Sequence, residues 1–371
     1  MRTESQSASL QTSPSILVYR IGFLGDTVCS LPALWEIRQR HPEARLALLT
    51  NSGLERGEVA PWDVLEPTRM FSEVVFYNPY ANRWERIWDC FVLAIRIRRM
   101  RPAMLYYLAP TPRSKMQVWR DGIFFRGLCG IRRIRGLQTT DGWVGKRDGH
   151  GPIPLPAESV RLSRVVGSAA ADRSYPVPIS DEDRTLVDLL WQRSGIPPNV
   201  ATVAFAPGAK TPVARWPKEN YRTLAQRLLS AFPNLRLLVV GGPSDARIAQ
   251  DLRESLGPRV VSVAGQLSVW QSAEAIRRCS LFVGNDSGPM HLAALMGVRC
   301  VAVFSARAHP GIWDPQGNGH IIIRKSVACA GCLLSECYHQ GMACMTSITT
   351  DEVFDACFRV LTQDQVGLAV S

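Results

Sequence analysis

The sequence predicts an α/β fold made of two consecutive domains, each with a parallel sheet. Three observations predict it. The length of 371 residues suits two domains of ordinary size. The composition, 46% apolar and 20% charged, supports full hydrophobic cores and excludes global disorder. Short β-branched runs also alternate with helical patterns in each half of the chain, as parallel α/β sheets require.

The first half starts with a β-branched run at Ile16–Arg20, followed by a Gly-containing turn and a helical pattern that has Pro32 near its start. The later runs have the same character and are separated by helical stretches such as Trp84–Arg101. The further strands expected in this half are Arg45–Leu49, Glu73–Phe76 and Met104–Leu108.

Residues 151–178 are rich in Pro, Gly, Ser and Ala, and we interpret them as the connection between the domains. A helix at Asp181–Ser194 follows, and then a second alternation begins. Its expected strands are Val200–Ala206, Arg236–Val240, Val260–Ser262, Leu281–Gly284 and Arg299–Phe304, with helices at Lys218–Ala231 and Val269–Arg278. We therefore divide the chain into residues 14–178, residues 179–350, and a C-terminal helix and tail at 351–371.

Ligands of such sheets bind at the carboxyl ends of the strands, which directs attention to the loops there. The loop Asn285–His291 lies between an expected strand and a helix, and a helix start offers free amides to a phosphate. Ser287 can cap this helix, Gly288 lets a ligand approach the backbone, and Pro289 suits the first helical position. His291 lies one turn in, within reach of a phosphate or ribose oxygen. The alternative is an ordinary capped helix with a hydrogen-bonded histidine.

Two other loops follow strands. The loop at 207–217 offers two cations, Lys210 and Arg215, and the hydroxyl of Thr211. The sequence Gly241–Asp245 is a third Gly-rich strand end, although such a turn is weak evidence by itself.

Four motifs occur in a fixed order along the chain: RIGFLGDTVCSLPAL, PGA…RWP, VVGGPSD and GNDSGPMHLAALMG. Together they resemble glycosyltransferase family 9, which contains the ADP-heptose:lipopolysaccharide heptosyltransferases. The resemblance extends from Ile16 to about Thr349. It implies the GT-B fold, in which two Rossmann-like, doubly wound domains face each other across a cleft, in agreement with the two α/β halves.

The resemblance also implies roles for particular residues. Asp26 matches the family's general base, which takes the proton from an acceptor hydroxyl as it attacks the anomeric carbon. A helix N-cap is the alternative role for this carboxylate, and the two are compatible. The donor-binding motif around the diphosphate and ribose is matched by Asp286, Ser287, Gly288 and His291. Amides and cations would stabilise the departing nucleoside diphosphate, so no divalent metal is expected to be required.

The chain departs from the family pattern at one position. Members commonly carry a Lys two residues before the Trp-Pro pair, where it contacts donor phosphate, and here that residue is Ala214. Arg215 or Lys210 would then supply the charge. A different sugar nucleotide remains an alternative, because a guanidinium one residue further along points in another direction.

The sequence contains ten cysteines, which we expect to be mostly reduced in an intracellular protein. Four of them lie within 16 residues near the C-terminus and are candidates for a structural zinc or iron site: Cys329, Cys332, Cys337 and Cys344. The resemblance adds that a related autotransporter heptosyltransferase group carries an iron-binding cysteine finger. Reduced thiols or a disulfide are the alternatives.

The net charge of +11 is concentrated in one region, since residues 83–147 hold 15 Lys and Arg against four acids. Such a region attracts polyanions or anionic lipids. The N-terminal half binds the acceptor in the GT-B fold, so we expect Arg113, Lys115 and Arg120 to line the cleft and contact a phosphorylated glycolipid. A solvated helix face is one alternative. Nucleic acid is another, although no aromatic stacking pattern accompanies the charge.

These expectations combine into one hypothesis. The chain is a metal-independent, inverting glycosyltransferase that transfers heptose from ADP-heptose to a phosphorylated lipopolysaccharide inner core by direct displacement. No apolar run approaches the ~18 residues of a spanning helix, and the polar N-terminus lacks a signal-like segment. We therefore expect a cytoplasmic protein associated peripherally with the inner membrane. The alternatives are another sugar nucleotide, a protein acceptor, or an inactive nucleotide-binding scaffold. An epimerase of the same fold would lack the Gly-Asp motif at Asp26.

Overall fold

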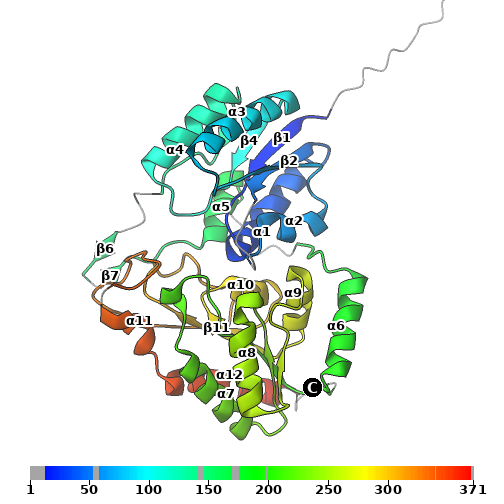
Figure 1. The fold of residues 1–371 in the computed structure, drawn as a ribbon, viewed down its shortest axis with the longest axis vertical. Helices are drawn as coiled ribbons and strands as arrows, with labels where there is room; N and C mark the ends of the chain where they lie inside the picture. The colour runs from blue at the N-terminus through cyan, green and yellow to red at the C-terminus, as the bar shows by residue number, and fades with distance from the viewer. Residues whose placement is uncertain are drawn as a thin grey trace, which may run out of the picture.

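A computed structural model describes residues 13–52, 58–140, 142, 146–149, 151–168, 175–197, 199–338 and 340–368. Most of the polar N-terminus considered above lies outside these residues. The chain forms two lobes, one above the other in Figure 1, and each lobe is built on its own parallel sheet. None of the described helices combines the length and the hydropathy needed to cross a bilayer.

The N-terminal sheet has the strand order β3-β2-β1-β4-β5, with every pair parallel. Its strands are β1 (Ser15–Tyr19), β2 (Arg45–Asn51), β3 (Glu73–Tyr77), β4 (Met104–Tyr107) and β5 (Ile134–Arg135). Successive residues of a strand face opposite sides of the sheet. Ile16 and Val18 of β1 accordingly join one core cluster, and Leu17 and Tyr19 join another.

Helices cover both faces of this sheet. They are α1 (Leu24–Arg40), α2 (Pro61–Leu65), α3 (Arg83–Met100), α4 (Lys115–Gly122), which continues as a π-helical turn (Ile123–Leu128), and α5 (Glu158–Val166). Residues of α1, α2 and α5 pack on the face that contains Ile16, and α3 and the π-helical turn pack on the face that contains Leu17. A short hairpin of β6 (Arg147–Asp148) and β7 (Gly151–Pro152) precedes α5.

The C-terminal sheet has the order β10-β9-β8-β11-β12-β13, again with every pair parallel. Its strands are β8 (Thr202–Ala206), β9 (Arg236–Val239), β10 (Val260–Ser262), β11 (Leu281–Asn285), β12 (Cys300–Phe304) and β13 (Ile321–Arg324). Its helices are α6 (Asp181–Arg193), α7 (Lys218–Ala231), α8 (Ala246–Leu256), α9 (Val269–Arg277), α10 (Gly288–Leu295), α11 (Ala343–Thr346) and α12 (Thr350–Leu368).

The strand order of each sheet reverses direction next to its first strand, between β1 and β4 in one sheet and between β8 and β11 in the other. Open parallel sheets bind ligands in the crevice that forms at such a switch point. The loop that contains Gly22 follows β1, whereas the loops at 207–217 and 286–287 follow β8 and β11. Two of the loops selected from the sequence, 207–217 and 285–291, therefore lie at the switch point of the C-terminal sheet, and the turn before Asp26 lies at that of the N-terminal sheet.

The two domains meet through the starts of α1 and α10. A Cβ added to Gly25 would come within 2.7 Å of the His291 ring, and one added to Gly288 would come within 2.9 Å of the Leu24 Cβ. Side chains from both domains belong to a single core cluster. A buried hydrogen bond of 3.1 Å from the indole of Trp270 to the carbonyl of Val64 also joins them.

Three features differ from the sequence-based expectation. Helix α5 lies inside the segment that we expected to be only a connection, and its Leu162 and Val166 are fully buried. Pro32 lies in the middle of α1 rather than near its start. The strands β5 and β13 were also not expected. The α/β class with two parallel sheets is confirmed, and the proposed domain boundaries stay predictions.

Helix α5 provides a test of this packing. We expect Leu162→Ala to lower the free energy of unfolding by about 2–5 kcal/mol, because it leaves a cavity between α5 and α1. Leu189→Ala removes a side chain that is 46% exposed on α6 and should cost less than about 0.5 kcal/mol. Urea denaturation followed by circular dichroism measures both variants. Equal effects would mean that α5 does not contribute to the core.

Candidate functional site

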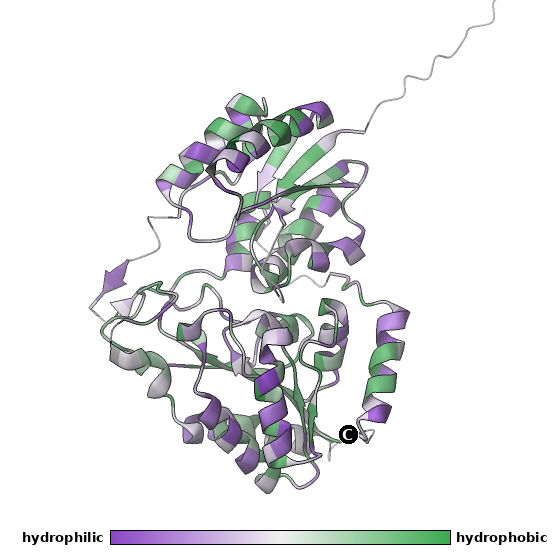
Figure 2. Ribbon diagram, in the orientation of Figure 1, coloured by the Kyte–Doolittle hydropathy of each residue, from purple (hydrophilic) through white to green (hydrophobic). Residues whose placement is uncertain are grey.

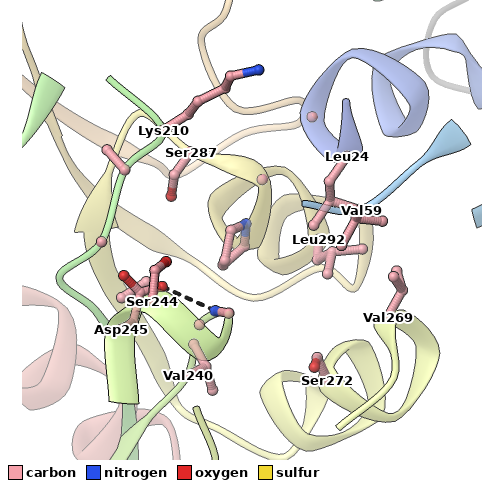
Figure 3. A pocket seen from close by; sticks show the side chains of 18 of the residues that line it. Leu24, Val59, Lys210, Val240, Ser244, Asp245, Val269, Ser272, Ser287 and Leu292 are labelled. Carbon is pink, nitrogen blue, oxygen red and sulfur yellow. Dashed lines mark hydrogen bonds between the residues drawn. The ribbon is translucent and has the colours of Figure 1, made fainter. Parts of the chain in front are cut away.

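A cavity of about 530 Å³ lies where the two switch points meet. Its volume falls within the range of small-molecule sites. In Figure 3, Leu24 and Val59 of the N-terminal domain face Lys210, Ser287 and Val269 of the C-terminal domain. Residues on the C-terminal side include Arg215, Gly241, Gly242, Ser244, Asp245, Gly265, Leu267, Ser272, Ile276, Gly288, Pro289 and Leu292.

The start of α10 forms one wall of this cavity through Ser287, Gly288 and Pro289. Ser287 occupies the N-cap position, but its hydroxyl donates to the carbonyl of Asn285 at 3.2 Å and caps no helix amide. Gly288 is required for the close approach of Leu24, whereas the sequence suggested a ligand in this role. The first amides of α10 lack helical acceptors, as at any helix start. This wall therefore suits an anion.

Two cations line the same cavity. Lys210 makes an ion pair of 3.1 Å with Glu58 and lies over the ring of Phe23, so it links the two domains. The Nε of Arg215 donates to the carbonyl of Ala209 at 2.8 Å. Ala214, at the family's lysine position, is buried. Thr211 is half-buried and, among the described residues, lies outside the cavity lining.

The Gly-rich loop after β9 contributes Asp245. Its Oδ2 accepts a hydrogen bond of 2.9 Å from the amide of Gly242, and burial raises its pKa. A Cβ on Gly241 would collide with this carboxylate. The motif of this loop is weak evidence by itself, and the apolar part of the wall was not predicted from the sequence: Val240, Leu267, Val269, Ile276 and Leu292. The apolar residues come from four separate elements, so no local pattern could have brought them together.

Asp26 lies in the first turn of α1, directly after the lining residues Phe23, Leu24 and Gly25. Its Oδ2 accepts a hydrogen bond of 2.9 Å from the Phe23 amide. Phe23 therefore occupies the N-cap position, and Asp26 is the third residue of the helix, whose side chain bonds back to the N-cap amide. Burial raises the pKa of Asp26, and the charges of Arg20 and Lys210 oppose this rise. Asp26 is thus a half-buried carboxyl whose pKa is influenced by Lys210, a cation of the other domain.

Asp286 follows β11, and its amide donates to the carbonyl of Val303 at 3.2 Å. Burial raises its pKa to about 7, against the opposing charges of Arg307 and Arg324. The charge of Asp26 also raises it. The two carboxyls therefore lie close enough to influence each other across the domain interface.

His291 is buried at the domain interface rather than on the cavity wall. Its Nδ1 is 3.5 Å from the thiol sulfur of Cys29 on α1, and its ring packs edge-on against Trp313. Burial lowers its pKa to about 4, so the ring is neutral at pH 7. This placement agrees better with the alternative considered above, a histidine whose partners are other residues of the protein, than with a histidine that contacts a ligand directly.

The three cations expected to bind the acceptor have different environments. Arg113 is buried, donates to the hydroxyl of Tyr19 at 3.1 Å and lies 3.6 Å from Asp121. Arg120 is exposed and donates to the same carboxylate from Nε and Nη2. Lys115 is exposed at the first position of α4. Arg113 therefore belongs to a buried polar cluster, and only the other two are open to a ligand from solvent.

The four C-terminal cysteines gather in one region, because the other three thiols influence the pKa of Cys344. Burial is nevertheless the main cause of the rise in that pKa. Within the described part of the chain, no three His, Cys, Asp or Glu side chains are arranged to hold a metal ion. None of the ten cysteines is paired in a disulfide. The predicted structural zinc or iron is thus not confirmed.

The arrangement defines a class of protein: two Rossmann-like domains with joined switch points and a cavity between them, which is the GT-B type. The model of "Glycosyltransferase family 9 (heptosyltransferase)" matches residues 182–343. Lipooligosaccharide heptosyltransferase 2 of Haemophilus influenzae is 28% identical over 127 residues, which cover 33% of this chain and 36% of that protein. By these matches, residues 182–343 are similar to glycosyltransferase family 9.

Solved structures extend the likeness to the whole fold. That of Escherichia coli ADP-heptose lps heptosyltransferase II has a TM-score of 0.64 at 20% identity and covers 95% of this chain and 99% of the other. The glycosyl transferase family 9 protein of Veillonella parvula has a TM-score of 0.68 at 18% identity, with 94% and 97% covered. The sequence matches span less than half the length of the curated relatives.

The raised pKa of Asp286 predicts a pH effect on stability. An aspartate has a pKa of about 3.9 in an unfolded chain, so the folded protein binds this proton more tightly. The resulting stabilisation is complete below about pH 4 and is lost as the pH rises through 7. Asp286→Asn cannot ionise, so its free energy of unfolding should fall less between pH 5 and pH 8 than that of the wild type.

Urea denaturation across this pH range measures the difference. Asp181→Asn is the matched control, because Asp181 is exposed at the start of α6. It should follow the wild-type curve. If Asp286→Asn also followed that curve, Asp286 would be ionised in the folded protein at pH 5.

Proposed function

We propose that this protein is an inverting glycosyltransferase that transfers a heptose from ADP-heptose to a phosphorylated lipopolysaccharide inner-core acceptor. The observation that carries the proposal is the shared cavity. Asp26 lies beside it on one domain, and the start of α10 with Lys210 and Arg215 lines it on the other. A base and an anion site on opposite sides are what direct displacement of a nucleoside diphosphate requires.

The donor fits the C-terminal side of the cavity. The apolar residues Val240, Leu267, Val269 and Ile276 offer a surface for the base, and Gly241 and Gly242 allow close approach of the backbone. The diphosphate would lie against Ser287 and Gly288, where free amides and the helix dipole favour negative charge. Lys210 and Arg215 would take the place of the family lysine that is Ala214 here.

The reaction then proceeds in one displacement. The acceptor hydroxyl loses its proton to Asp26 while its oxygen forms a bond to the anomeric carbon. The bond from that carbon to the diphosphate oxygen breaks on the opposite face, which inverts the configuration. ADP leaves with the additional negative charge, and the cations and amides stabilise it without a divalent metal. The raised pKa of Asp26 makes it a stronger proton acceptor than an exposed aspartate.

The acceptor would approach from the N-terminal domain, where Lys115 and Arg120 offer exposed positive charge. Because the proposed acceptor is a glycolipid, we place the protein in the cytoplasm, peripherally associated with the inner membrane. The names of the relatives, lipooligosaccharide and lipopolysaccharide heptosyltransferase 2, support the choice of a glycolipid acceptor. A different sugar nucleotide or a protein acceptor is the second candidate, favoured by the replacement of the family lysine.

The base assignment is tested with Asp26→Asn. The amide oxygen of Asn can still accept the hydrogen bond from the Phe23 amide, so the helix start should persist. We expect turnover of ADP-heptose to fall by about 10²- to 10⁴-fold while the Kd for ADP stays near the wild-type value. Turnover is measured by ADP release and the Kd by calorimetry.

Asp183→Asn is the matched control, since Asp183 accepts the corresponding hydrogen bond from the amide of Ser180 at the start of α6, far from the cavity. It should leave turnover unchanged. Near-normal turnover of Asp26→Asn would rule out Asp26 as the base.

The phosphate contacts are tested with Lys210→Met and Arg215→Met. A hydrogen bond between charged groups contributes about 1.5–3 kcal/mol, so each variant should weaken ADP binding by about 10-fold or more. Lys218→Met is the control, because Lys218 lies near the same loop with a side chain that is 67% exposed. Calorimetry with ADP and with UDP also tests the nucleotide. Tighter binding of UDP would favour the second candidate.

A further inference from the structure

An unusual apolar stripe runs along α3. The exposed side chains recur at the spacing of one helical face, and Trp84 and Trp88 are 80% and 70% exposed. The stripe consists of Trp84, Ile87, Trp88, Phe91, Val92 and Ile95. The side chains of α3 that reach the core, Ala94 and Ile97, come from its second half. The stripe therefore faces away from the sheet.

A second exposed stripe lies on the neighbouring element. On α4 and the π-helical turn, Met116, Trp119 and Ile123 are 78%, 69% and 47% exposed, again at helical spacing. The two elements run side by side, because Arg98 of α3 donates to the carbonyl of Gly127. Figure 2 shows hydrophobic residues along both helices, at the end of the N-terminal domain away from the C-terminal domain. Together the two stripes make a face that we call the α3–α4 face.

Cations surround this face. Arg96, Arg98 and Arg99 lie at the C-terminal end of α3, and Lys115 and Arg120 lie on α4. All five are exposed. Tryptophans and aliphatic side chains bordered by Arg and Lys are typical of helices that lie in the interface of a bilayer. Anionic lipid headgroups would meet the cations while the aromatic rings enter the boundary with the acyl chains.

We propose that the α3–α4 face inserts Trp84, Trp88 and Trp119 into the surface of a bilayer that contains anionic lipids. The inference specifies how the proposed membrane association occurs and rests on that part of the proposed function, but it does not depend on the sugar that is transferred. Because the face lies at the far end of the N-terminal domain (Figure 1), docking would leave the cavity between the domains accessible.

The test is flotation of the full chain with vesicles of phosphatidylcholine mixed with phosphatidylglycerol. The wild type should float with the mixed vesicles, less with phosphatidylcholine alone and less at high salt. The triple variant Trp84→Ser, Trp88→Ser, Trp119→Ser should partition into the mixed vesicles at least about 10-fold less than the wild type. A matched control replaces three exposed apolar residues elsewhere, Leu186, Leu189 and Tyr338, by Ser and should behave as the wild type.

Circular dichroism and ADP calorimetry establish that the variants remain folded. Equal flotation of the triple variant and the wild type would overturn the inference and leave the membrane association intact. Absence of flotation for the wild type would overturn both, while the transfer reaction could still be assayed with a soluble acceptor. Sedimentation velocity without lipid tests the remaining outcome, which is self-association of the protein. A dimer that the triple variant dissociates would identify the face as a contact between copies of this chain and overturn the inference.

Discussion

The contact between the starts of α1 and α10 is the constraint on which the site depends. Each helix begins near a glycine that accommodates a side chain of the other: Gly25 lies against His291, and Gly288 lies against Leu24. A Cβ at either position would come within 3.0 Å of that side chain, so the contact could not persist unchanged. Two helix starts with partial positive charge are thereby brought to one cavity, together with Lys210 and Arg215. A ligand with several negative charges is the natural counterpart of that arrangement.

Two opposing effects set the pKa values of the carboxyls at this junction. Burial raises the pKa of both Asp26 and Asp286, and in each case nearby arginines limit the rise. For Asp26 that arginine is Arg20, which is fully buried and donates to the carbonyl of Leu108 at 2.7 Å. Arg20 directly follows β1, and Leu108 directly follows β4. The same switch point that forms the crevice therefore also holds the charge that balances Asp26.

Much of the fold could be predicted from the sequence, because β-branched runs and loop motifs are local signals. Helix α5 was missed since its single apolar face follows a segment dominated by Pro and Gly. The burial of Arg113 was missed for another reason: its partners Tyr19 and Asp121 lie on separate elements. Glu58 carries no motif, and in the cavity wall it pairs with Lys210 of the other domain. Contacts between domains leave no pattern along the chain.

The two faces of the N-terminal sheet connect the cavity to the α3–α4 face. Alternate residues of β1 pack on α1 at one side and on α3 at the other, so the position of one helix fixes that of the other. The hydrogen bond from Arg113 to Tyr19 and its ion pair with Asp121 also join the end of β1 to α4. Protein interiors are close-packed and deform little. A surface bound at α3 and α4 would therefore stand at a fixed distance from Asp26, which suits an acceptor whose lipid part stays in the bilayer while its sugar reaches the base.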